Sequence, residues 1–162
     1  MNNKLKLYQL TTTIKCINHQ QRDPSSITKS LLHEIKRNTR QLQRDSRTRL
    51  RAKSVSSEAL KSSYRYLILY PNKSNNKFSV FINPEVVEVS LSFYRSNRWD
   101  YISMRYNRKI KVKLHHWVKI KYYSMKLRKE IINELYGGEI SDLIQIEIHH
   151  LNGGHDLLEE SV

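Results

Sequence analysis

Apolar residues in the first third of the chain recur at helical spacing. Five of them share one side of a helix drawn at about 3.6 residues per turn: Ile27, Leu31, Ile35, Leu42 and Leu50. The preceding Asp23-Pro24-Ser25-Ser26 is typical of a helix start, because a serine side chain caps free backbone amides and a proline marks the entry. The pattern predicts a helix from about Ser26 to Lys53.

Alternation of apolar and polar residues replaces helical spacing in the middle of the chain. Residues 64–70 form an apolar, β-prone run, apolar and polar residues alternate in 78–82 and 87–93, and 99–106 and 109–116 also have strand patterns. Turn-forming residues follow several of them, at Pro71-Asn72, Asn83-Pro84, 95–98 and Asn107-Arg108. Each segment therefore predicts a half-buried strand, and the last two predict a hairpin. Lysines alternate with aliphatic residues in 109–116, which would give the sheet one cationic face.

The pattern changes twice more toward the C-terminus. From about Val118 a helical side is shared by five residues: Ile120, Ser124, Leu127, Ile131 and Leu135. Gly137 is a plausible stop for this second helix. Ile144, Ile146 and Ile148 then alternate with polar residues, which predicts a final strand ending at 151–154.

These elements predict an α+β fold with a basic N-terminal helix, an antiparallel sheet, a second helix and a C-terminal strand. The length of 162 residues suits one domain with a modest core. We expect a basic N-terminal segment over 1–22, a basic helical arm over 23–53 and an α+β domain over 64–162.

The formal net charge of +14 is unevenly distributed along the chain. Residues 1–63 carry 14 Lys and Arg against 4 Asp and Glu, residues 64–135 carry 15 against 5, and residues 136–162 carry 0 against 6. Such charge attracts polyanions, of which nucleic acid is the commonest. The alternative is a solvated surface shaped by genome composition. The expected nucleic-acid-binding residues are Arg37, Arg40, Arg44, Arg47, Arg51, Arg105, Lys109, Lys111 and Lys113.

A single cysteine, Cys16, rules out an intrachain disulfide and a cysteine-rich zinc site. A reducing compartment is expected, either the bacterial cytoplasm or an organelle such as a plastid or mitochondrion. No apolar run reaches the roughly 18 residues of a membrane span, so no membrane partner is expected. The sequence leaves the oligomeric state and the choice between DNA and RNA open.

Three histidines, a Gly-Gly pair and two acids gather in residues 146–156, a stretch without Lys or Arg. Side chains alternate along a strand, so adjacent His149 and His150 at its end would face opposite sides. In metal-assisted phosphodiester hydrolysis, one such imidazole could bind the cation while the other takes a proton from water.

At these residues the chain resembles the HNH nucleases of the intron-encoded or homing type. Their ββα-metal core begins with a strand ending in Asp-His or His-His, followed by a loop that often contains Gly-Gly. The resemblance implies that His149 is a metal ligand, that His150 is the catalytic base, and that His155 or Asp156 completes the site around a divalent ion such as Mg²⁺. The family's later Asn-Leu pair and second metal-binding histidine have no counterpart, which implies a truncated or degenerate nuclease.

Other functions remain open from the sequence. The histidine pair could end an ordinary strand and hydrogen-bond locally. A non-enzymatic RNA-binding or ribosome-associated protein fits the same charge, as does an interaction module for an acidic partner. The sequence therefore predicts nucleic-acid binding, with metal-dependent endonuclease activity as a possibility.

Overall fold

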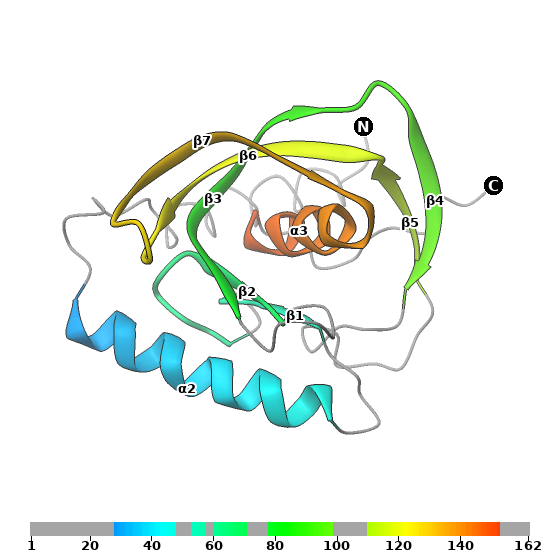
Figure 1. Cartoon of the computed structure of the whole chain (residues 1–162). Coiled ribbons are helices and arrows are strands. Elements are labelled where there is room, and N and C mark those ends of the chain that lie inside the picture. The colour runs from blue at the N-terminus through cyan, green and yellow to red at the C-terminus, as the bar shows by residue number, and fades with distance from the viewer. Residues whose placement is uncertain (1–27, 48–52, 58–59, 71–77, 99–109, 153–162) are drawn as a thin grey trace, which may run out of the picture.

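Helix α3 lies at the centre of the fold, enclosed by strands, and helix α2 lies outside the strands (Figure 1). The computed structural model describes residues 28–47, 53–57, 60–70, 78–98 and 110–152. The elements in chain order are α2 (Lys29–Ser46), β1 (Ser54–Ser56), β2 (Tyr66–Leu69), β3 (Ser79–Val89), β4 (Phe93–Arg98), β5 (Ile110–His115), β6 (Trp117–Ser124), β7 (Lys129–Gly137) and α3 (Gly138–Leu151).

The strands form two antiparallel sheets. Five are hydrogen-bonded in the order β1-β2-β3-β6-β7, and β4 pairs with β5 in a second sheet. Strand β3 is the middle strand of the large sheet. Its pairing with β6 shifts register between Ile82 and Glu85 and again between Val86 and Glu88. Asn83, with a φ of 50°, lies at the first of these irregularities. The strand bends there, so the sheet curves around α3 (Figure 1).

Strand β2 separates two hydrophobic cores. All four of its residues are buried. Leu67 and Leu69 pack in the core with α3, whereas Tyr66 and Ile68 pack in the core with α2. This division follows from the alternation of side chains along a strand. A strand covered on both faces reads as a continuous apolar run, and residues 66–69 have that pattern.

The helix expected near the N-terminus is confirmed over Lys29–Ser46. The Thr28 side chain accepts a hydrogen bond from the Leu31 amide at 3.2 Å, which caps the first turn. Leu31, Ile35 and Leu42 are buried against the sheet. The last residues of the predicted helix, 48–52, lie outside the described part of the chain.

A buried hydrogen-bond chain joins α2 to β2. Asn38 Nδ2 donates to Tyr66 Oη at 2.6 Å, and Tyr66 Oη donates to Glu34 Oε1 at 2.7 Å. Burial, and next the hydrogen bond to Glu34, raise the pKa of Tyr66 well above its ordinary value. Tyr66 therefore stays protonated and keeps its donor role at every physiological pH.

Helix α3 is buried on most of its sides, as expected of a helix enclosed by other elements, and its buried residues include polar ones. Its first residue, Gly138, has a φ of +59°, a left-handed conformation that glycine adopts without strain. The buried apolar residues of the helix are Leu143, Ile144, Ile146, Ile148 and Leu151. None of the helices in the described ranges is both long and apolar enough to cross a membrane.

The structure corrects two predicted elements. The helix expected from Val118 to Leu135 is wrong, because β6 and β7 occupy this region as an antiparallel pair. In β6 the buried Val118 and Ile120 alternate with lysines, which is strand spacing, and Leu127 and Leu135 of the expected helical side are exposed. The strand expected at 144–151 is also wrong, because this segment belongs to α3. The isoleucines alternate with polar residues, but an enclosed helix does not need a single apolar side.

Smaller differences concern turns and joints. The turns expected at Asn83-Pro84 and 95–98 lie inside β3 and β4, respectively. The polar joint expected over 54–63 contains strand β1. The hairpin turn expected at Asn107-Arg108 and the strand expected at 99–106 lie outside the described residues. The α+β class with an antiparallel sheet is confirmed.

Candidate functional site

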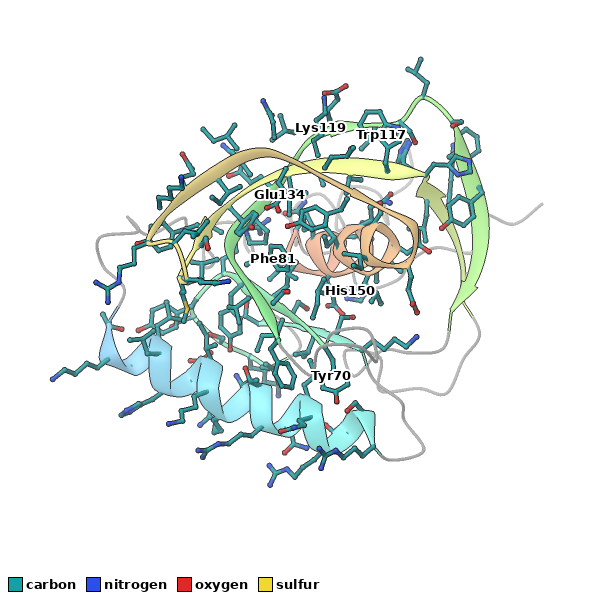
Figure 2. The ribbon with its side chains drawn as sticks, in the orientation of Figure 1. Tyr70, Phe81, Trp117, Lys119, Glu134 and His150 are labelled. Carbon is teal, nitrogen blue, oxygen red and sulfur yellow. The ribbon has the colours of Figure 1, made fainter. Side chains whose placement is uncertain are left out.

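Glu147 and His150 form a buried pair on α3. They are three residues apart in the helix, with His150 Nδ1 3.5 Å from Glu147 Oε2. Glu147 is fully buried and His150 is 4% exposed. In Figure 2, His150 lies on the side of α3 that faces β1 and β2. Ionisable side chains are rarely buried this deeply without a partner, so the pair is the strongest candidate for a site on α3.

Strand β1 supplies a third member of this cluster. Ser54 Oγ donates to Glu147 Oε1 at 2.6 Å, within the buried interface between β1 and α3. Val55 packs in the α2 core, so alternation places Ser54 and Ser56 on the side of α3. The serine donates to the carboxylate, and the other oxygen of that carboxylate faces the imidazole. This order differs from a Ser-His-acid triad, in which the histidine lies between the other two residues.

Hydrogen-bonding capacity is left unused around this cluster. Three buried side-chain atoms of the described residues have no hydrogen-bond partner: Ser56 Oγ, Glu147 Oε2 and His149 Nε2. One such atom costs about 1–3 kcal/mol. All three atoms belong to residues of β1 or α3, so these two elements contain polar groups with unused hydrogen-bonding capacity.

His149 is held in its neutral form. Burial lowers the pKa of His149, and the charge of neighbouring His150 lowers it further. The two imidazole rings lie 6.4 Å apart between centroids. They occupy successive positions of a helix, so the placement on opposite faces of a strand end is wrong. His155 and Asp156, the other expected metal ligands, lie outside the described residues.

Side-chain contacts hold both ends of α3. Arg65 on the loop before β2 donates to the Leu151 carbonyl at 3.0 Å and to Asn152 Oδ1 at 2.8 Å, at the C-terminus of the helix. Lys53 pairs with Glu139 near its N-terminus. Cations near the helix C-terminus and acids near its N-terminus both stabilise the helix dipole. The candidate pair is therefore carried on a helix that is held at both ends.

A side chain of α3 also holds the second sheet. Gln145 Nε2 donates to the His115 carbonyl, and the His115 amide donates to Gln145 Oε1, both at 2.9 Å. The Gln145 side-chain amide thus makes with the His115 backbone the pair of hydrogen bonds that a neighbouring strand would make. His115 Nδ1 lies 2.7 Å from the Ser90 carbonyl. These contacts give His115 a structural role in holding β5.

The donor set on α3 can be compared with a known metal-binding helix. The pattern H-E-x-x-H places two histidines four residues apart on one helical face, where they bind zinc, with the glutamate as general base. Residues 146–150 read Ile-Glu-Ile-His-His, so Glu147 and His150 fit the pattern and Ile146 occupies the first ligand position. No group of three or more His, Cys, Asp or Glu side chains suited to a metal occurs among the described residues.

The cations expected to bind nucleic acid are spread over separate elements. Arg37, Arg40 and Arg44 are exposed on α2, and Arg47 is exposed at its C-cap. The long side chains of this helix project away from the sheet (Figure 2). Lys113 on β5 lies with Nζ 3.8 Å from the centroid of the Phe93 ring. Lys111 is also on β5. Arg51, Arg105 and Lys109 lie outside the described residues.

Comparison with solved structures identifies the fold. A class I type b peptide deformylase from Acinetobacter baumannii with Met-Ala-Ser bound matches with a TM-score of 0.64 and 20% identity, over 83% of this chain and 84% of that one. A plant peptide deformylase matches with a TM-score of 0.70 and 14% identity, over 86% of this chain and 71% of the plant chain. This chain has the peptide deformylase fold. The enzyme from Thermotoga maritima gives a TM-score of 0.64 at 18% identity, over 85% and 86%. No protein-family model and no curated protein matches the sequence.

The deformylase fold overturns the HNH assignment. The ββα-metal core needs a strand that ends in the histidine pair, but these residues lie in α3. The expected nucleic-acid partner and endonuclease activity are therefore wrong, and so is the alternative of an RNA-binding or ribosome-associated protein. The basic composition misled the prediction, because net charge reports on solubility and association and does not identify a fold.

Two members of the buried cluster were missed from the sequence. Glu147 fell on the polar side of an expected strand, and Ser54 fell in an expected joint. The Glu-x-x-His spacing of Glu147 and His150 was the available signal, because it has a chemical meaning only on a helix. Nothing in the local sequence marks Ser54 as a partner of Glu147.

Proposed function

We propose that this chain is a peptide-binding protein built on the peptide deformylase fold. The observation that carries the proposal is the match, over 83% of this chain, to a deformylase with the tripeptide Met-Ala-Ser bound. The ligand class expected here is accordingly a short peptide with a methionine at its N-terminus. The neighbours come from bacteria and a plant, and a bacterial cytoplasm or an organelle is the proposed setting.

The second sheet offers a place for an extended peptide. Strands β4 and β5 pair only with each other among the described strands, so the outer edge of β4 has no strand beside it. An added peptide gains main-chain hydrogen bonds at such an edge, and apolar side chains beside it provide selectivity. Phe93, at the start of β4, is 50% exposed, and Leu91 next to it is fully exposed. These side chains suit the methionine of the ligand.

The proposal does not include hydrolysis. Peptide deformylases use a divalent metal, but the described donors of α3 do not form a complete ligand set, since Ile146 occupies the first ligand position of the H-E-x-x-H pattern. A metal-bound water has no supported site here, and we derive no step through one. Glu147 and His150 are assigned to holding α3 and β1 together.

Isothermal titration calorimetry with Met-Ala-Ser tests this function. We expect saturable binding, weaker binding of Ala-Ala-Ser, and no formate release from formyl-Met-Ala-Ser with or without added Ni²⁺ or Zn²⁺. If none of these three peptides binds, the proposed function is rejected. Metal-dependent formate release would show that the chain hydrolyses its ligand.

A pair of variants tests whether the peptide binds along the outer edge of β4. Phe93→Asp places a charge beside the β4 edge and should weaken Met-Ala-Ser binding about tenfold or more, equivalent to about 1.4 kcal/mol. Leu127→Asp is the matched control, because Leu127 is 56% exposed and lies in the turn between β6 and β7. Equal affinity of the two variants would move the peptide site away from β4.

A further inference from the structure

The position four residues before His150 is decisive for metal binding on α3. Side chains four residues apart on a helix lie one above the other on the same face, about 5–6 Å apart at Cβ. A histidine there could share a metal ion with His150. Ile146 is fully buried and belongs to the apolar core with Leu67 and Phe81. An aliphatic side chain in this position supplies no lone pair.

Of the remaining polar groups, the Glu147 carboxylate is only partly satisfied within the protein. Glu147 Oε1 accepts the hydrogen bond of Ser54, and Glu147 Oε2 faces His150 Nδ1 at 3.5 Å. Glu147 and His150 are both buried. The contact of Ser54 with Glu147 joins β1 to α3, and the contact of Glu147 with His150 lies within α3. Glu147 Oε2 has no hydrogen-bond partner among the described residues, but Glu147 and His150 do not complete a ligand set, because the H-E-x-x-H pattern binds its metal through two histidines.

We infer that α3 of this chain binds no divalent metal and that the Ser54–Glu147–His150 cluster serves instead as a metal-free connection between β1 and α3. The inference goes beyond peptide binding and stands whether or not the chain binds peptides. It makes Ile146 the residue that separates this chain from a metal-binding helix of the H-E-x-x-H type.

Metal analysis of the full-length wild-type protein is the first test. We expect less than stoichiometric Fe, Ni or Zn after purification without chelator, and no change of the melting temperature on adding Ni²⁺ or EDTA. Stoichiometric metal that is lost in His150→Ala would overturn the inference. This measurement uses no peptide, so its result is independent of the proposed function.

A gain-of-function variant is the second test. Ile146→His creates the H-E-x-x-H pattern and adds an imidazole on the same helical face as His150, so it should bind Ni²⁺ at least about tenfold tighter than wild type, equivalent to about 1.4 kcal/mol. The melting temperature of the variant should rise when Ni²⁺ is added, because a ligand that binds only the folded state stabilises it.

Ile148→His is the matched control for this variant. Ile148 is a buried isoleucine of the same helix, but it lies two residues from His150 and therefore on another face. Equal Ni²⁺ binding by the two variants would overturn the assignment of Ile146 as the missing position. If Ile146→His does not fold, the metal content and the Ni²⁺ response of the wild type decide the inference alone.

Discussion

Ser54 on β1 donates a hydrogen bond to the fully buried carboxylate of Glu147 on α3, across 93 positions of the sequence. The bond ties one edge of the large sheet to the central helix. It also satisfies the one oxygen of Glu147 that has a hydrogen-bond partner, since Oε2 has none. The stability of the α3 interface therefore depends on a small side chain in a three-residue strand.

Ser54→Ala should destabilise the protein by about 1–3 kcal/mol, because a buried carboxylate loses its hydrogen-bond donor. Urea denaturation measures the change in the free energy of unfolding. Ser79→Ala is the control, since Ser79 is exposed on β3 and surface changes usually stay within about 0.5 kcal/mol. Equal losses in the two variants would show that the bond contributes little.

Protonation of His149 should destabilise the fold. Burial lowers the pKa of His149 in the folded protein below its ordinary value of 6.5. The unfolded chain then takes up a proton first as the pH falls, so this contribution is complete above about pH 6.5 and is lost as the pH falls through the folded pKa. Urea denaturation at pH 7.5 and pH 5.5 measures the loss.

His149→Gln should reduce that pH dependence, because the side chain no longer titrates. His33→Gln replaces an exposed histidine of α2 and is the comparison. If the stability of His149→Gln falls with pH as steeply as that of wild type, His149 is not the group responsible.

Arg65→Ala should destabilise the protein by about 1.5–3 kcal/mol or more, the range for one hydrogen bond to a charged group. Arg65 donates to the carbonyls of Leu151 and Pro84, both at 3.0 Å, and to Asn152. Arg65→Lys keeps the charge but lacks the fork of donors, so an intermediate loss is expected in thermal denaturation. Lys126→Ala, at an exposed turn, is the control. Full stability in Arg65→Lys would show that charge alone is sufficient.

Gln145→Glu should loosen the β4–β5 sheet. The substitution removes the N–H that donates to the His115 carbonyl and places a carboxylate beside that oxygen. Hydrogen exchange should become faster at β5 amides and stay unchanged at β2, which packs on other residues of α3. Uniform acceleration over both sheets would instead indicate global destabilisation and argue against a local role for Gln145.

The sequence alone predicted the elements in which buried residues recur at a regular spacing along the chain. Helix α2 rests on the sheet with one side, so Leu31, Ile35 and Leu42 recur at helical spacing. Strand β2 and the alternating segment at β5 were also predicted, and together they indicated the α+β class. The Glu147–His150 spacing was present in the sequence but had no meaning until the segment was known to be helical.

Tertiary structure alone decided the identity of α3 and the cluster around it. Strands enclose α3, so its apolar residues need no single side, and Ile144, Ile146 and Ile148 could be taken for a strand. Ser54 meets Glu147 only because the curved sheet brings β1 against the central helix. Local periodicity determines how one segment exposes its side chains, whereas contacts between distant segments depend on how the whole chain packs.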